Sequence, residues 1–335
     1  TLAHDAWNDL IYKQWWTDVT GTTEADGTFR TRGFLGDYDV EYTVNGVTRT
    51  LPLTTSSNTL PTYVSNGSVA GTLTAAGVVN GASFQGGSVA PGEIVTIFGS
   101  GFGPASIAQA SYGADRKLPT SVGDTKVLFD GIAAPMIYAA AGQTAAIAPY
   151  AIKTTTKIQV EYLGTVSNAV ALPVAAAAPG IFQCANKPGV AVVVNYSAGG
   201  KISCNDDYTP PGPGDVVSFY ATGEGAVTPA IGDGQAPAGV YPAPGAWSAA
   251  FGGVTAQMCA STFIGLVYAG VTQVNVCVPE GAPRTASVPL TLTVGGVQSP
   301  PAATDLSPGW KLIWSDEFNG AAGSPPDGSK WAFDL

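Results

Sequence analysis

Short alternations of apolar and polar residues, separated by turn residues, recur along most of the chain. Segments such as Ile94–Phe98, Lys126–Phe129, Lys157–Tyr162 and Ala169–Val174 carry apolar side chains at about every second position, which is the period of a half-buried strand. Gly, Pro and Asp-Gly stand between these segments and favour tight turns. The pattern predicts an all-β fold.

The pattern of strands and turns occurs twice. Pro91-Gly92 and Phe98 have counterparts 122 residues later, in Pro213-Gly214 and Tyr220. Further along, the spacing becomes 130 residues because Cys259–Leu266 adds eight residues to the second copy. The pairs at this second spacing are Tyr138 with Tyr268, Gln143 with Gln273, and Pro149 with Pro279.

Each copy has the size of a known architecture. Roughly seven strands over about 100 to 120 residues is typical of an immunoglobulin-like sandwich. We therefore predict two tandem immunoglobulin-like β-sandwiches, at 76–176 and 177–303.

The flanks have a different pattern. In 1–64, Ala6, Leu10, Lys13 and Trp16 recur at a helical period, and Asp26-Gly27 and Asn45-Gly46 favour hairpin turns. We expect a short N-terminal helix with a β-extension there, a linker at 65–75, and a second linker with one strand at 304–335. Because Thr1 is followed by no leader-like segment, the chain start is interpreted as an interior cut.

Composition excludes several classes of protein. The 335 residues carry a net charge of −10, which argues against a nucleic-acid partner. No apolar run is long enough to cross a membrane, so no membrane partner is expected. Gly (43) and Pro (25) are abundant and charged residues make up only 11%, which favours many short strands over long helices.

The four cysteines form two local pairs, Cys184 with Cys204 and Cys259 with Cys277. These spacings are not those of metal ligands, and the single histidine, His4, is distant in sequence, so we expect no metal and no cofactor. Disulfides between sequential partners are predicted, and they imply a secreted, extracellular protein. Four buried free thiols are the alternative.

Three regions of the chain resemble known families. Gly77–Phe84, Pro91–Pro104, Leu118–Tyr150 and Ala178–Phe182 are similar to an immunoglobulin-like module of large secreted proteins from soil bacteria. Residues 15–38, with Thr17, Gly21, Gly27, Phe29, Arg32-Gly33-Phe34, Gly36 and Tyr38, resemble the end of family 10 glycoside hydrolases, the endo-xylanases. Trp310–Leu335 resembles the entry strand of family 16 glycoside hydrolases, the laminarinases and β-glucanases.

These resemblances imply an internal piece of a multimodular glycoside hydrolase that degrades xylan or β-glucan. Family 16 enzymes use an E-x-D-x-x-E strand, which this chain lacks, and the family 10 carboxylates would lie upstream of Thr1. We therefore expect no catalytic residue in this chain. Its expected role is that of a monomeric, non-catalytic spacer or substrate-proximity region beside plant or microbial cell-wall polysaccharide.

Two other functions stay open, a carbohydrate-binding module and a cell-surface adhesion module. Carbohydrate binding needs exposed aromatic platforms, and the candidates are Trp247, Tyr241 and Tyr208 in Pro-rich loops. The alternative for Trp247 is an ordinary packing residue at the start of a strand.

Overall fold

The computed structural model describes residues 18–24, 29–31, 35–44, 47–55, 71–243, 245–308 and 320–325. The helix expected at Ala3–Thr17 lies outside the described residues, and so do the strand expected in the last segment, Asp26-Gly27 and Asn45-Gly46. Within the described residues the elements are strands, apart from the short 3-10 helix η2 at Tyr196–Ala198. The predicted all-β fold is confirmed.

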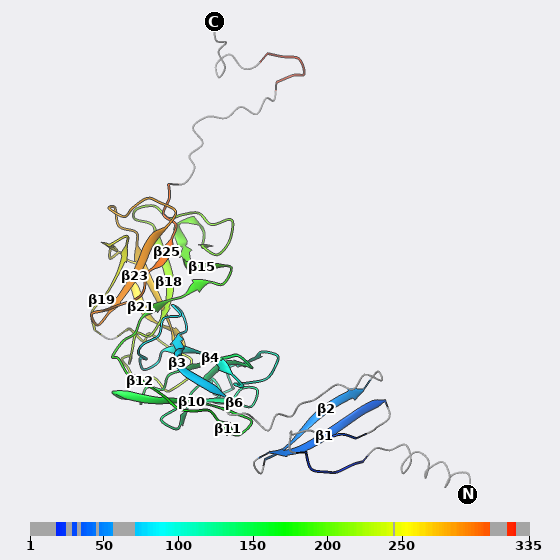
Figure 1. Cartoon of the computed structure of the whole chain (residues 1–335). Coiled ribbons are helices and arrows are strands. Elements are labelled where there is room, and N and C mark those ends of the chain that lie inside the picture. Colours follow the sequence, from blue (N-terminus) through cyan, green and yellow to red (C-terminus); the bar gives the residue numbers. More distant parts are fainter. Residues whose placement is uncertain are drawn as a thin grey trace, which may run out of the picture.

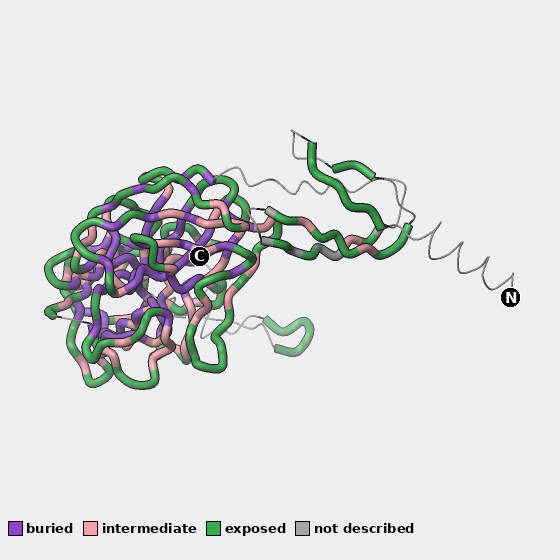
Figure 2. Tube along the Cα trace, turned by 90° about the horizontal axis from the view of Figure 1, so that it is seen from below, coloured by how far each residue is buried: buried purple, intermediate pink, exposed green. Residues whose placement is uncertain are grey.

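A separate hairpin precedes the sandwiches. Strands β1 (Gly36–Val44) and β2 (Val47–Thr55) pair antiparallel from Val44 opposite Val47 to Gly36 opposite Thr55. Figure 1 shows this hairpin beside the sandwiches, and its exposed tube is mostly green in Figure 2.

The first sandwich contains two five-stranded antiparallel sheets. One has the order β3-β4-β9-β8-β5, and the other has β11-β10-β6-β7 with β12 paired to β10. The strands are β3 (Thr72–Asn80), β4 (Ile94–Ser100), β5 (Ala108–Gln109), β6 (Thr125–Phe129), β7 (Ile132–Ala133), β8 (Met136–Ala140), β9 (Gln143–Ile147), β10 (Thr155–Tyr162), β11 (Thr165–Val166) and β12 (Val170–Pro173).

The second sandwich is built in the same way but is larger, with one sheet of six strands and one of seven. Its first sheet has the order β17-β16-β18-β22-β21 with β13 paired to β18, and its second has β14-β15-β25-β23-β19-β20 with β24 paired to β23. The strands are β13 (Gly180–Ile181), β14 (Gln183–Cys184), β15 (Lys187–Ala191), β16 (Val193–Asn195), β17 (Lys201–Ile202), β18 (Val216–Thr222), β19 (Trp247–Phe251), β20 (Val254–Thr255), β21 (Phe263–Tyr268), β22 (Val271–Cys277), β23 (Val288–Val294), β24 (Val297–Gln298) and β25 (Ala302–Thr304).

The sequence repeat corresponds to a structural repeat. Strand β18 begins and ends 122 residues after β4, and β19 begins and ends 122 residues after β6. Phe129 and Phe251, at matching positions, are both fully buried in their own cores. A serine hydroxyl closes the same hairpin in each copy, because Val160 N donates to Ser167 Oγ and Leu292 N donates to Ser299 Oγ.

The two sandwiches meet in a tightly bonded contact, which we call the joint. Leu118 N donates to Gly234 O at 3.0 Å and Ala236 N donates to Arg116 O at 2.9 Å, so the loop at 113–118 pairs with the loop at 233–237. Ile94 N donates to the Thr222 hydroxyl at 2.8 Å. Ile94, Ile147 and Ala269 form a small apolar cluster beside these bonds, and Figure 1 shows the two bodies in direct contact.

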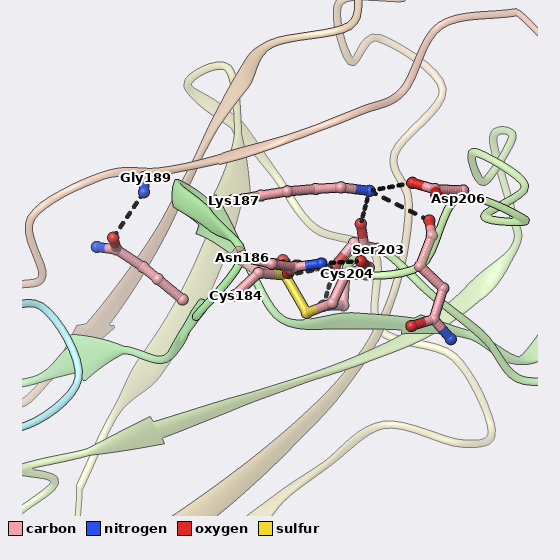
Figure 3. The surroundings of a disulfide bond; sticks show 11 residues. Cys184, Asn186, Lys187, Gly189, Ser203, Cys204 and Asp206 are labelled. Carbon is pink, nitrogen blue, oxygen red and sulfur yellow. Dashed lines mark hydrogen bonds and ion pairs between the residues drawn. A yellow bond between two sulfur atoms is a disulfide. The ribbon is translucent and has the colours of Figure 1, made fainter.

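Both predicted disulfides are present, in the second sandwich. Cys184 bonds to Cys204 and Cys259 bonds to Cys277, so the four-thiol alternative is wrong. In Figure 3 the Lys187 ammonium lies beside the first bridge and donates to the carbonyl oxygens of Ser203 and Asn205. Two disulfides indicate folding in an oxidising compartment outside the cytoplasm. No helix among the described residues has the length and apolarity to cross a bilayer.

Candidate functional site

The aromatic residues predicted from sequence do not form one platform. Trp247 begins β19, is half-buried, and packs against the core of the second sandwich, as in the packing interpretation. Tyr241 is also half-buried, and its carbonyl oxygen accepts from Leu266 N at the edge of the other sheet.

Tyr208 lies at the opposite end of the sandwich from Trp247. Thr304 lies near the Tyr208 hydroxyl and pairs with Val288, whereas Trp247 pairs with Val294. Six residues of β23 therefore separate the two neighbourhoods, a distance of roughly 20 Å at the usual strand rise. Burial raises the pKa of Tyr208 to about 12, and its hydroxyl makes no hydrogen bond of normal geometry, although the Thr304 hydroxyl lies near enough to lower this pKa. The role of these three residues in sugar binding stays a prediction.

A different set of aromatic residues gathers on the outer face of the sheet β17-β16-β18-β22-β21. Along β18, Val217, Phe219 and Ala221 are buried in the core. Because successive side chains on a strand point to opposite faces, Ser218 and Tyr220 point to the outer face, where Ser218 is fully buried and Tyr220 is half-buried. On β22 the same alternation places Val274 and Val276 in the core and Gln273 and Asn275 outside.

Three tyrosines occupy this outer face. Tyr196 follows β16 and is 49% exposed, Tyr268 ends β21 and is 61% exposed, and Tyr220 lies between them, half-buried. Burial raises the pKa of Tyr220, and the neighbouring Tyr196 and Tyr268 raise it further, so each of these two tyrosines lies within electrostatic reach of the Tyr220 hydroxyl.

The tyrosines follow a diagonal across the sheet. Tyr220 is opposite Gln273, and Tyr268 is opposite Val271, two residues further along β22 toward the joint. Tyr196 continues β16 beyond the pair of Asn195 with Val217, on the side away from the joint. With strands about 4.8 Å apart and about 3.3 Å of rise per residue, the Cα atoms of Tyr196 and Tyr268 lie roughly 25 Å apart.

A hydrogen-bonded polar ladder lies between the tyrosines. The Ser218 hydroxyl donates to Asn275 Oδ1 at 2.5 Å, and Gln273 Nε2 donates to the same oxygen at 2.8 Å. These bonds fix the orientation of both amides while Asn275 Nδ2 keeps its protons for another acceptor. We call Tyr196, Tyr220, Tyr268, Ser218, Gln273 and Asn275 together the tyrosine face.

The eight-residue insertion forms a wall of this face. Ser261, inside the insertion, lines an open pocket of about 390 Å³ together with Tyr196, Ser197, Val216 and Asn275. The bridge from Cys259 to Cys277 ties the insertion to the end of β22. The feature that breaks the register of the sequence repeat therefore shapes the site.

The tyrosine face was not predicted from the sequence, although the repeat carried a signal for it. Tyr220, Tyr268 and Gln273 are three of the positions that the repeat aligns, with Phe98, Tyr138 and Gln143. Aligned aromatic and amide residues on alternating strand positions are candidates for a shared outer face. Tyr196 had no such signal, because Gly81 stands after the equivalent strand, β3.

Two buried carboxyl groups lie at the joint. Burial raises the pKa of Glu93 to about 8 and that of Glu224 to about 7, and the charge of Glu224 adds to the shift at Glu93. Asn80 Nδ2 donates to Glu93 Oε1 and to Ala178 O, which links both sandwiches.

Glu224 is less well satisfied than Glu93. The Thr272 hydroxyl lies near enough to lower its pKa, yet neither Glu224 Oε2 nor Thr272 Oγ1 makes a hydrogen bond of normal geometry. Glu93 is 0% and Glu224 3% exposed, so no polysaccharide chain reaches these carboxyls. We assign them a structural role. Within the described residues, no group of three or more His, Cys, Asp or Glu side chains lies together.

Comparison with known proteins adds little to this picture. No protein-family model matches the chain, and no curated protein matches it. Among solved structures it is similar to SGBP-B from a complex xyloglucan utilization locus in Bacteroides uniformis, with 15% identity, a TM-score of 0.22, and coverage of 65% of this chain and 46% of that one.

Two further structures match at a similar level. A tandem from titin has 9% identity and a TM-score of 0.20, and covers 81% of this chain and 74% of its own. Domains 5–6 of the S-layer protein SbsC have 12% identity and a TM-score of 0.23, with 70% and 98% covered. Likeness at such low TM-scores does not indicate a function, which depends on the residues of this chain.

Proposed function

We propose that this chain is a non-catalytic, glycan-binding region of an extracellular polysaccharide-degrading protein, and that the tyrosine face is its binding site. The observation that carries the proposal is the combination of exposed tyrosine rings with oriented amides on one sheet face. This favours the carbohydrate-binding alternative over the simple spacer expected from the sequence.

The chemistry of the face suits a sugar chain. A pyranose presents C–H groups on its ring faces, which pack against an aromatic ring, and hydroxyls at its edge, which exchange hydrogen bonds with amides and phenols. Tyr196, Tyr220 and Tyr268 supply the rings, and Gln273 and Asn275 supply donors and acceptors.

The face favours a neutral glycan. None of its six residues carries a charge at neutral pH, and the chain as a whole has a net charge of −10. An acidic polysaccharide would be repelled by the field of the protein and would find no cation on the face. Neutral xylan or β-glucan of plant or microbial cell walls fits both the face and the families that the flanks resemble.

A rigid spacer is the second candidate function. The joint favours it, because backbone hydrogen bonds such as Leu118 N to Gly234 O fix the mutual direction of the sandwiches. The two functions are compatible in one chain, since a spacer that also binds glycan would keep a neighbouring catalytic domain near its substrate.

Affinity electrophoresis on laminarin, hydroxyethyl cellulose and soluble xylan tests the proposal. We expect retardation of the wild-type chain on at least one neutral glycan, and about fivefold weaker retention for Tyr268→Ala, because loss of an aromatic anchor costs about 1 kcal/mol or more. Phe98→Ala is the matched control, because Phe98 is 40% exposed at the position that aligns with Tyr220. It is expected to bind like the wild type.

Two results would contradict this assignment. Migration unchanged on every glycan would remove the binding function and leave the spacer. Loss of retention in Trp247→Ala, with Tyr268→Ala unaffected, would move the site to the loop residues predicted from sequence. Circular dichroism of each variant checks that the fold is intact.

A further inference from the structure

The tyrosine face ends at the joint, where a residue of the other sandwich meets it. Tyr268 is followed by Ala269, whose backbone N–H donates to the Tyr112 hydroxyl at 3.1 Å. Tyr112 belongs to the first sandwich, in the segment between β5 and β6, and it is 39% exposed. An exposed tyrosine therefore lies at the joint end of the diagonal of Tyr196, Tyr220 and Tyr268.

We infer that the binding site continues across the joint onto Tyr112, so that its full ligand is an extended chain of several sugar units bound by both sandwiches together. This inference rests on the proposed glycan-binding function. It adds the length of the ligand and the residue, Tyr112, that distinguishes a long chain from a short one.

The ring of Tyr112 is held in place from both ends. Its hydroxyl is fixed by Ala269 N, and the loop that follows it is paired to the second sandwich through Arg116 O and Leu118 N. Arg116 also donates from its guanidinium to Pro237 O at 3.1 Å. A ring that is already ordered loses little entropy when a ligand packs against it, so it can contribute to affinity.

The direction of the diagonal supports a chain that crosses the joint. Tyr196 lies at the end of the sheet away from the first sandwich, and Tyr268 lies at the end toward it. The span of roughly 25 Å between them already exceeds a single sugar ring or a disaccharide. A short oligosaccharide would occupy only the part of the site on the second sandwich, and a longer one would reach Tyr112.

Calorimetric titration with a trisaccharide and a hexasaccharide of the glycan that is retained in electrophoresis, for example cellotriose and cellohexaose, tests this inference. We expect the wild-type chain to bind the hexasaccharide more tightly than the trisaccharide. Tyr112→Ala is expected to weaken binding of the hexasaccharide about fivefold and to leave binding of the trisaccharide unchanged, because only the longer chain reaches the lost ring.

Tyr112→Phe separates the ring from its hydrogen bond. It removes the hydroxyl that accepts from Ala269 N but keeps the aromatic surface, and we expect it to retain the preference for the hexasaccharide. Hydrogen–deuterium exchange of the wild-type chain gives a readout that needs no variant. Residues 110–118 should gain protection from exchange with the hexasaccharide and not with the trisaccharide.

The outcomes distinguish this inference from the function on which it rests. Equal binding of the trisaccharide and the hexasaccharide, or a Tyr112→Ala chain that keeps the full preference for the hexasaccharide, would overturn a site that crosses the joint. Either result would leave glycan binding by the second sandwich intact. A wild-type chain that binds neither oligosaccharide and no polysaccharide would overturn both.

Discussion

The two sandwiches share matching strands, such as β4 with β18 and β6 with β19, yet their corresponding outer faces differ. On strand β22 of the second sandwich Asn275 completes a polar ladder, and Ala145 stands at the aligned position of the first. Tyr196 similarly has Gly81 as its counterpart. The inward positions, such as Phe129 and Phe251, keep their apolar character in both copies. Core alternation maintains the fold, and the outward positions are free to acquire a function.

Burial at the joint produces a second contrast between aligned residues. Glu93 and Asp215 both accept a hydrogen bond from a backbone N–H three residues earlier, from Ala90 at 2.6 Å and from Gly212 at 2.7 Å. Glu93 is covered by the other sandwich, whereas Asp215 stays half-buried. The same local turn therefore has a different electrostatic environment in each copy.

The largest expected effect is a fall in stability as pH rises. Glu93 and Glu224 have folded-state pKa values of about 8 and about 7, raised from 4.5, so the folded state keeps protons that the unfolded state releases. Stability from these groups is fully present below about pH 4.5 and is lost up to about pH 8. At about 1.4 kcal/mol per pKa unit, Glu224 alone accounts for roughly 3 kcal/mol.

Urea unfolding at a series of pH values measures this slope. The double variant Glu93→Gln, Glu224→Gln should flatten it, and Asp215→Asn should leave it unchanged because Asp215 is outside the joint. A slope as steep in the double variant as in the wild type would show that other groups cause it.

The next effect concerns the contrast between the second sandwich, which has two disulfides, and the first, which has no cysteine. Replacing Cys259 and Cys277 with alanine opens a loop of 18 residues, and a loss of about 3 kcal/mol in the free energy of unfolding is expected. Glycan retention should fall as well, because the insertion that carries Ser261 would lose its anchor beside the tyrosine face.

The other disulfide provides the control. Removing Cys184 and Cys204 should cost a similar free energy of unfolding, since that bridge closes a loop of 20 residues. It lies beside the pocket lined by Lys187 and Tyr208 and contributes no residue to the tyrosine face, so retention should persist. Equal loss of retention in both double variants would show that general destabilisation is responsible.

The smallest expected effect compares one amide in two contexts. Gln273→Ala should weaken glycan binding about fivefold, because it removes a donor and releases Asn275 from its fixed orientation. Gln143→Ala, at the aligned position of the first sandwich, should leave binding unchanged. Calorimetry on both variants would refute the assignment of the face if Gln143→Ala had the larger effect.

Strand alternation and the repeat were enough to predict the sandwich pair and the pairing of its cysteines, because both depend on local periodicity and short loops. The tyrosine face was harder to predict. Trp247 and Tyr208 were chosen for their residue type and Pro-rich context, but side-chain direction depends on strand register, which a loop does not reveal. The joint has no periodic signal at all, since it pairs the loops at 113–118 and 233–237 only in three dimensions.

The connection between the sandwiches also determines how the chain responds to load. Ala175 N donates to Val89 O and Ala178 N donates to Gly223 O, so the few residues that link the two bodies are already committed to them. The connection has no free length that could extend before the joint separates. Under a pulling force applied at its two ends, the pair of sandwiches would therefore resist extension as one rigid body and would not stretch like a flexible linker.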